Sequence, residues 1–363
     1  MEENPKYLTE QIITYIGNKR SLLKEISLQI EECLRRLGKE KAVTADLFSG
    51  SGIVARMLKK YSSAMHVNDL EDYSYIINDC YLTNREDFNE SLYDEYKARI
   101  EKAGLFTNGN IYRNYAPKDD RNIKEGERVF YTTENAILID TYRNAINEIP
   151  ADYRKFFIAP LLYEASVHTN TSGVFKGFYK SKTTGIGKLG GDGENAMERI
   201  TGKITLRKPV LSNFSCKASL YKADANYLST ILKNIDITYL DPPYNQHPYG
   251  SNYFMLNVIA NNDSGYDMSR VSGIPTEWNR SDYNKKSMAL NALKNLIYSI
   301  DSKYIITSYN NEGFISLDEM CEMMSIFGNV SYKPIEYVSF RGGRQSKDRN
   351  IHTTEYLFTL EKS

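Results

Sequence analysis

The stretch AVTADLFSGSG, residues 42–52, indicates the fold of this chain. Residues 42–48 are mostly apolar or β-branched and predict a strand, and Ser-Gly-Ser-Gly at 49–52 is a glycine turn. A helical pattern follows from about Ile53, and residues 65–69 predict a second strand that ends on an acid. This order of strand, glycine turn, helix, strand and acid is typical of a nucleotide-binding βαβ unit. We therefore predict an α/β fold in which the glycine turn faces a ligand.

The glycine turn also restricts the class of ligand. Gly50 and Gly52 let the backbone approach a ligand closely, and the start of the next helix attracts a carboxylate or phosphate. No third glycine follows as in dinucleotide binders, and the turn lacks the Gly-Lys-Ser/Thr of a phosphate loop. Asp69, at the end of the second strand, can accept the hydroxyls of a ribose. The pattern favours an adenosine without a pyrophosphate.

A third strand end carries Asp241-Pro242-Pro243-Tyr244. The apolar run at 237–240 predicts a strand, and two successive prolines stop it. Asp241 is thus expected at the carboxyl edge of the sheet, where open α/β sheets bind their ligands. An acidic acceptor, a fixed backbone carbonyl and an aromatic ring together suit chemistry on a planar amino group.

The amino-terminal motif Tyr15-Ile16-Gly17-Asn18-Lys19 follows a β-prone run, and a helical pattern from Ser21 is expected to stop at Gly38. By itself the motif indicates a strand end with a solvated lysine. The functional interpretation is that Lys19 pairs with a carboxylate of a cofactor and that Tyr15 packs near it.

The middle of the chain has a different composition. Helices are predicted at 72–105, 133–148 and 152–168, and further strands at 219–221, 235–240, 303–307 and 355–360. Residues 170–222 contain ten Lys or Arg and three Asp or Glu, an excess of seven positive charges in a chain with 46 of each sign. A flexible solvated loop is the alternative to a DNA contact here. The candidate phosphate contacts are Lys176, Lys180, Lys182, Lys188, Arg207 and Lys208, with a second basic patch at Arg341 and Arg344.

Length and composition set further limits. The 363 residues suggest one large α/β core with an insert. Four cysteines and four histidines are scattered without metal-ligand spacing, so we expect free thiols and no metal site. The polar, acidic amino terminus and the lack of a long apolar stretch predict a cytoplasmic protein without a signal peptide or membrane span.

Three motifs follow one another along the chain, Tyr15 to Lys19, Asp46 to Gly52 and Asp241 to Tyr244. In this order they resemble those of the Dam-like (alpha, D12 class) DNA adenine-N6 methyltransferases, which include type II modification methylases. The resemblance extends over about 11–90 and 219–360, and Ser308 to Gly313 is similar to a later motif of these methylases. It implies a Rossmann-like methyltransferase core formed by 1–90 and 219–363. Residues 91–218 would be an inserted helical and basic, glycine-rich target-recognition region.

The resemblance also implies partners and residue roles. The cofactor would be S-adenosyl-L-methionine and the substrate double-stranded DNA, and a cognate restriction endonuclease is left open. Asp224 resembles an acid near the cofactor adenine, although a helix cap is nearly as good an interpretation. The implied cofactor-binding residues are Tyr15, Lys19, Asp46, Phe48, Gly50, Gly52, Asp69, Asp224 and Asp241. The implied catalytic residues are Asp241, Pro242, Pro243 and Tyr244.

The implied reaction is transfer of a methyl group to the N6 amine of adenine. Asp241 and the carbonyl of Pro242 would accept the two amine N–H bonds, and Tyr244 would stack on a base that has left the duplex. A cytosine-N4 methyltransferase is one alternative, although those enzymes more often carry Ser before Pro-Pro. A methyltransferase-like DNA-binding module without activity is another, against which the intact Asp241, Tyr244, Gly50 and Gly52 argue.

Overall fold

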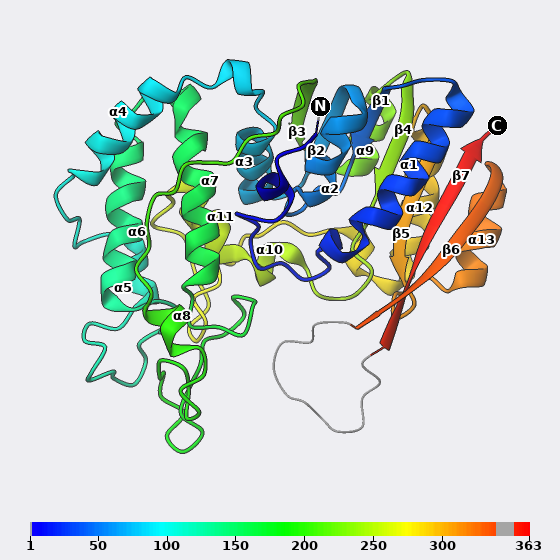
Figure 1. Cartoon of the computed structure of the whole chain (residues 1–363). Coiled ribbons are helices and arrows are strands. Elements are labelled where there is room, and N and C mark those ends of the chain that lie inside the picture. Colours follow the sequence, from blue (N-terminus) through cyan, green and yellow to red (C-terminus); the bar gives the residue numbers. More distant parts are fainter. Residues whose placement is uncertain (1, 339–351) are drawn as a thin grey trace.

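Seven strands form one sheet at the centre of the protein, shown as a computed structural model in Figure 1. The structure describes residues 2–338 and 352–363. The strand order is β3-β2-β1-β4-β5-β7-β6. β1 to β5 run parallel, whereas β7 is antiparallel to both β5 and β6. The strands are β1 (Ala42–Asp46), β2 (Ser62–Asp69), β3 (Lys217–Lys222), β4 (Ile235–Leu240), β5 (Ser302–Asn310), β6 (Gly328–Val338) and β7 (His352–Lys362).

The sheet extends from β1 in both directions, because β1 pairs with β2 on one side and with β4 on the other. In open α/β sheets such a switch point leaves a crevice beyond the carboxyl ends of the strands. Asp46, Asp69 and Asp241 lie at the ends of β1, β2 and β4 respectively. The topology therefore brings together three acids that are far apart in the sequence, and it confirms the predicted Rossmann-like α/β fold.

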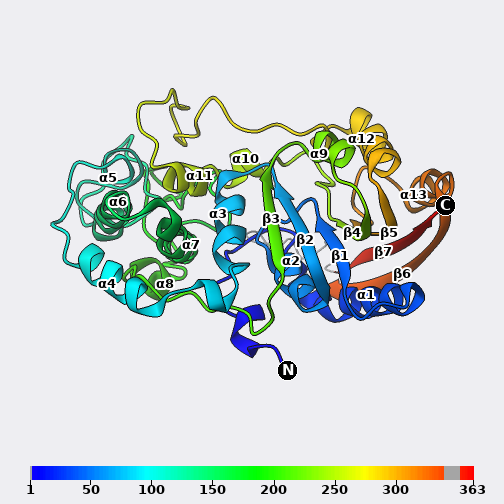
Figure 2. The same ribbon diagram turned by 90° about the horizontal axis from the view of Figure 1, so that it is seen from above.

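Helices cover both faces of the sheet (Figure 2). On one face, α1 (Leu23–Leu37) and α2 (Ile53–Leu58) pack on the apolar side chains of β1, β2 and β4. On the other face lie α9 (Ala225–Ile231), α12 (Lys286–Ser299) and α13 (Leu317–Ser325). This arrangement buries the strands on both sides, which explains their continuous apolar runs.

A helical part lies beside β3, at the left of Figures 1 and 2. Its core contains many buried aromatic rings, including Tyr93, Phe130 and Phe157. Helix α11, which follows the Asp241 loop, packs into the same core, so the chain returns to this part after β4. The helices are α3 (Asp72–Tyr81), α4 (Glu90–Glu101), α5 (Asn110–Tyr115), α6 (Thr133–Ile146), α7 (Ala151–Val167), α8 (Met197–Thr201), α10 (Tyr249–Asn252) and α11 (Phe254–Asn261).

Some local predictions were wrong. Residues 11–16 form no strand, because Gln11 has a left-handed backbone and its side chain bonds to the backbone of Lys208 and Val210. Helix α1 begins at Leu23 rather than Ser21, since Asn18 caps a preceding 3-10 turn. Strand β6 was not predicted. The 3-10 turns are η1 (Pro5–Leu8), η2 (Lys19–Leu22), η3 (Lys59–Tyr61), η4 (Arg85–Asp87) and η5 (Asp282–Asn284).

The end of the first long helix and the state of the cysteines were predicted correctly. Gly38 ends α1 in a left-handed conformation with φ of 65°. All four cysteines are free thiols, three of them buried. Within residues 2–338 and 352–363, no helix is long and apolar enough to cross a membrane. The same residues contain no cluster of three or more His, Cys, Asp or Glu placed to hold a metal ion.

Candidate active site

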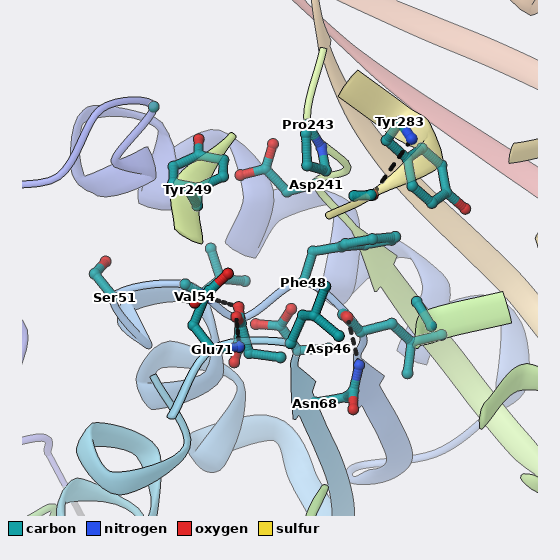
Figure 3. Close-up of a pocket in the computed structure, with 18 of the residues that line it drawn as sticks. Asp46, Phe48, Ser51, Val54, Asn68, Glu71, Asp241, Pro243, Tyr249 and Tyr283 are labelled. Atoms are coloured by element: carbon teal, nitrogen blue, oxygen red, sulfur yellow. Dashed lines mark hydrogen bonds between the residues drawn. The ribbon is translucent and has the colours of Figure 1, made fainter. Parts of the chain in front are cut away.

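A cavity opens at the carboxyl ends of β1, β2 and β4, with about 880 Å³ of empty space that is partly open to solvent. Figure 3 shows Asp241 and Tyr249 across this cavity from Asp46 and Glu71. Most of the sequence-predicted site residues line it, namely Tyr15, Lys19, Asp46, Phe48, Gly50, Asp69, Asp224, Asp241 and Pro243. Gly52, Pro242 and Tyr244 are not among the lining residues. Its place beyond the strand ends at the switch point is where open α/β sheets bind their ligands.

The glycine turn is held against the end of β2 by Asp69. The amide N–H groups of Gly50 and Glu71 donate to the two carboxyl oxygens of Asp69, at 2.7 and 3.0 Å. Gly50 has φ of 50°, and a Cβ there would lie 2.8 Å from Cε1 of Tyr15. Gly52, the residue before α2, has φ of 78°, and a Cβ there would lie 2.6 Å from Oδ1 of Asn78. Both glycines are therefore required by conformation and by space.

Asp46 is a buried acid whose carboxyl group faces the cavity. Its side chain is 1% exposed, and within the described chain neither carboxyl oxygen accepts a well-formed hydrogen bond. Burial, followed by the nearby Asp241, raises the pKa of Asp46 well above its usual value. The backbone N–H groups of Phe48 and Ala55 lower this pKa, but by less than burial raises it. A buried carboxylate with such weak partners is unfavourable. A ligand that brings a cation or N–H donors to this wall would relieve that cost.

Lys19 pairs with two carboxylates of the chain itself. Its Nζ lies 2.9 Å from Oδ1 of Asp241 and 3.2 Å from Oε1 of Glu355, and its side chain is 5% exposed. Burial would lower the pKa of Lys19, but Asp241 and Glu355 together raise it well above its usual value. The sequence placed Lys19 against a cofactor carboxylate. In the structure its ammonium group pairs with Asp241 of the Asp-Pro-Pro-Tyr motif.

The pKa of Asp241 is raised as well. Burial raises it, Lys19 lowers it and Glu355 raises it further, with a resulting pKa of about 6. The side chain is still 19% exposed toward the cavity. Asp241 is therefore an ionised hydrogen-bond acceptor at neutral pH, and a second group can reach it.

Stacked tyrosines join the amino-terminal motif to the chain after Asp241. The Tyr15 ring stacks on those of Tyr249 and Tyr253, with ring centroids 4.9 and 4.7 Å away, and the centroids of these two rings lie 6.0 Å apart. The hydroxyl of Tyr249 donates to the Ile16 carbonyl at 3.1 Å, and the Ile16 amide donates to the hydroxyl of Tyr253 at 2.7 Å. These contacts fix Tyr15 and Lys19 beside the Asp241 loop.

Tyr244 lies beyond the lining of the cavity. Its ring meets that of Tyr309 edge-on, with centroids 6.3 Å apart, and its carbonyl accepts from the Phe314 amide at 3.0 Å.

On another wall of the cavity, Phe48 packs edge-on against Tyr283, with centroids 5.1 Å apart. Asp224 accepts from the Tyr227 amide at 3.0 Å as the cap of α9, and it also lines the cavity, so its two interpretations are compatible.

Several lining residues were missed by the sequence analysis. Glu71 is buried, and Asn257 and Asn279 donate to its Oε2 at 2.6 and 3.3 Å. Burial is the main cause that raises the pKa of Glu71 to about 7. Its position two residues after Asp69 was the available signal, whereas its asparagine partners lie far along the chain. Tyr283 had no comparable signal.

The basic residues are not all alike. Lys176, Lys180 and Lys182 are exposed on the glycine-rich loop, which Asn170 anchors by bonds to Val129, Lys188 and Gly190. The other members of the set have acidic partners. These pairs are Lys188 with Asp192 at 3.7 Å, Arg207 with Glu164 at 2.9 Å, and Lys208 with Glu90 and Asp94 at 2.7 and 3.1 Å. Arg341 and Arg344 lie outside the described residues.

Comparison with known proteins agrees with this site. The sequence model of the D12 class N6 adenine-specific DNA methyltransferases matches residues 15–323. The type II methyltransferase M.NlaIII of Neisseria lactamica is 32% identical over 361 residues, which cover 97% of this chain and 100% of that protein. The modification methylase StsI of Streptococcus sanguinis is 27% identical, over 96% of this chain and 52% of its own length. The type II methyltransferase M.CviAII of Paramecium bursaria Chlorella virus 1 is 26% identical, over 95% of this chain and 97% of its own length. Three motifs at one sheet edge and a family match across most of the chain lead to one conclusion: this protein belongs to the D12 class of N6 adenine-specific DNA methyltransferases.

Proposed function

We propose that this methyltransferase uses S-adenosyl-L-methionine to methylate the N6 amine of adenine within a specific sequence of duplex DNA. The observation that carries the proposal is the position of Asp241. Its carboxyl group opens into the same cavity as the glycine turn, Asp46 and Asp69. The proposed acceptor for the amine and the residues proposed to bind a nucleoside thus line the same cavity.

The residues present fit this cofactor. Asp46, buried and without a well-formed hydrogen bond, suits the ammonium of the methionine part. Asp69 and Glu71 provide carboxyl groups beside the glycine turn for the ribose hydroxyls. Phe48 and Asp224 provide an aromatic surface and an acceptor for the adenine. When bound, S-adenosylmethionine supplies an electrophilic methyl group on a sulfonium.

The residues around Asp241 would activate the target amine. The N6 lone pair of adenine is delocalised into the ring, so the free amine is a poor nucleophile. Asp241 and the carbonyl of Pro242 would accept its two N–H bonds and direct the lone pair at the methyl carbon. Transfer would form the N–C bond as the C–S bond breaks with its electron pair left on sulfur, and one N–H proton would have to leave. Asp241 is ionised at neutral pH and can receive that proton.

The target base must leave the duplex to reach Asp241. Unpairing costs a few kcal/mol, and stacking on an aromatic ring offsets part of this cost. We assign that stacking to Tyr244, whose ring is fixed by its edge-on contact with Tyr309.

We assign DNA recognition to residues 91–218, beside the cavity-bearing core. Lys176, Lys180 and Lys182 are the foremost phosphate contacts because they are exposed on one loop. Lys188, Arg207 and Lys208 also belong to the proposed set. We expect them to contribute less to DNA affinity, since each already has an acidic partner. Arg341 and Arg344 stay in the proposal on the sequence alone.

The test is expression in a host that lacks DNA methylation, followed by single-molecule sequencing of the host genome. We expect N6-methyladenine at one recurring sequence. Methylcytosine in its place, or no modified base, would refute the proposal. The D241A variant should give no modification while it still binds DNA. D318A, at an exposed aspartate of α13, is the matched control and should modify DNA like the wild type.

The relatives include proteins named as modification methylases. We therefore propose that a restriction endonuclease with the same recognition sequence acts beside this enzyme. Genomic DNA that carries the enzyme's mark should resist such a nuclease, and unmarked DNA should be cut.

A further inference from the structure

A buried carboxylate on the last strand shares the lysine that contacts Asp241. Lys19 lies between Asp241 and Glu355, and Glu355 is 1% exposed. We propose that Glu355 is a positioning residue for methyl transfer. It holds Lys19 in place and offsets its charge, so that Asp241 keeps the acceptor strength that the amine requires. This inference rests on the proposed function, in which Asp241 receives the target amine.

Glu355 is itself held by strand β5. The hydroxyl of Ser308 donates to Oε1 of Glu355 at 2.5 Å, and the side-chain amide of Asn310 donates to Oε2 at 3.3 Å. Asn310 and Glu355 are directly paired residues of the antiparallel ladder between β5 and β7. A buried carboxylate is tolerated when it is paired and hydrogen-bonded, and both conditions are met here. Both carboxyl oxygens of Glu355 thus have hydrogen-bond donors on β5, and Oε1 also faces the ammonium of Lys19.

The charge balance explains the effect on Asp241. One ammonium between two carboxylates leaves one net negative charge in the cluster. Without Glu355, Lys19 would pair with Asp241 alone, and Asp241 would become a weaker acceptor. A net negative cluster also stabilises the positive charge that develops on the amine nitrogen during transfer.

The titratable and charged groups around Asp241 come from several elements. Lys19 is the one cation among these described groups. They are Lys19 of η2, Asp46 of β1, Tyr239 of β4, Tyr244 of the Asp241 loop, Tyr249 of α10 and Glu355 of β7. Lys19 lowers the pKa of Asp241 and Glu355 raises it. Removal of one or the other should therefore shift the same ionisation in opposite directions.

The experiment measures kcat and KM of the full-length enzyme across a range of pH, with a duplex substrate that holds the target sequence. For E355Q we expect kcat to fall by roughly ten- to a hundredfold, the range typical of removing a side chain that orients a metal ligand. KM for DNA should stay unchanged, and the acid limb of kcat should move to lower pH. K19M should move that limb to higher pH. E361Q removes a carboxylate that pairs with Arg36 and Lys303 elsewhere on the same strand, and it should match the wild type.

The results separate positioning from a purely structural role. An E355Q enzyme with the wild-type pH profile, or one that changes only KM, would overturn the inference while the wild-type activity keeps the proposed function intact. If E355Q fails to fold, E355D serves instead, since it keeps the charge but withdraws it from Lys19. A smaller shift of the acid limb to lower pH supports the inference, and an unshifted limb overturns it. A wild-type enzyme that methylates no adenine removes the proposed function as well.

Discussion

The amide of Gly50 donates a 2.7 Å hydrogen bond to Asp69, which joins the turn after β1 to the end of β2. The second carboxyl oxygen of Asp69 accepts from the Glu71 amide at 3.0 Å. One side chain thus fixes the backbone on two sides of the cavity. The shape of the ligand site depends on this acid even before a ligand is bound.

The first prediction concerns the D69N variant. An asparagine can accept only one of the two amide hydrogen bonds, because its NH2 group is itself a donor. We expect weaker S-adenosylmethionine binding and a free energy of unfolding lower by about 1–3 kcal/mol. Calorimetric titration and denaturant unfolding measure the two effects. D87N, at an exposed aspartate of η4, is the control. Wild-type affinity in D69N would show that the turn does not need this acid.

A second prediction compares two glycines with left-handed backbones. Gly50 has φ of 50° and Gly38 has φ of 65°, but a Cβ would meet Tyr15 only at Gly50, while nothing lies within 4 Å at Gly38. Both G38A and G50A should lose stability by roughly 1 kcal/mol from backbone strain. G50A should in addition bind the cofactor more weakly, since the turn or Tyr15 must move. Thermal unfolding and KM for the cofactor separate these effects, and equal KM values for both variants would contradict the prediction.

The sequence was sufficient for the parts of the site that lie at strand ends. Asp46, Asp69 and Asp241 each stand at the end of a predicted strand, and parallel strands place such ends at one edge of the sheet. The glycine turn and the double proline then led to the proposed class of ligand and to the proposed acceptor for the target amine. Local patterns could be read because each one combines a strand signal with a stop signal.

The remaining site residues depend on contacts between distant parts of the chain. Asn257 reaches Glu71 across 186 positions, and Ser308 reaches Glu355 across 47. Neither pair has a spacing that a helix or hairpin pattern could reveal. Lys19 was identified, but its two partners were not. Asp241 follows β4 and Glu355 lies on β7, and the two meet only once the sheet is formed. Strand pairing therefore decided what the lysine contacts.

A third prediction follows from the raised pKa of Asp46. Because burial raises this pKa in the folded protein, the folded state holds the proton more tightly than the unfolded state. The contribution of Asp46 to stability is therefore complete below the unfolded pKa, about 3.9, and falls as pH rises above it. D46N removes this loss, so the unliganded variant should gain stability relative to the wild type as pH rises toward neutrality. Its affinity for S-adenosylmethionine should fall by roughly tenfold or more, because a charged hydrogen-bond partner is lost.

Denaturant unfolding at acidic and neutral pH, together with calorimetric titration, tests the D46N prediction. A variant that is less stable at neutral pH and binds the cofactor normally would mean that Asp46 serves the fold rather than the ligand. D318N, at an exposed site, should show neither effect.

The final prediction concerns the salt dependence of DNA binding. Lys180 and Lys182 are exposed on the glycine-rich loop, whereas Lys208 is paired with Glu90 and Asp94 of α4. Each phosphate contact adds about 0.9 to the slope of log affinity against log salt concentration. The double variant K180Q/K182Q should therefore reduce the slope by up to about 1.8, while K208Q should change it little. Fluorescence anisotropy with a labelled duplex at several salt concentrations measures the slope. If K208Q alone reduces it, DNA follows the α4 side of the helical part, and the glycine-rich loop is not the main contact.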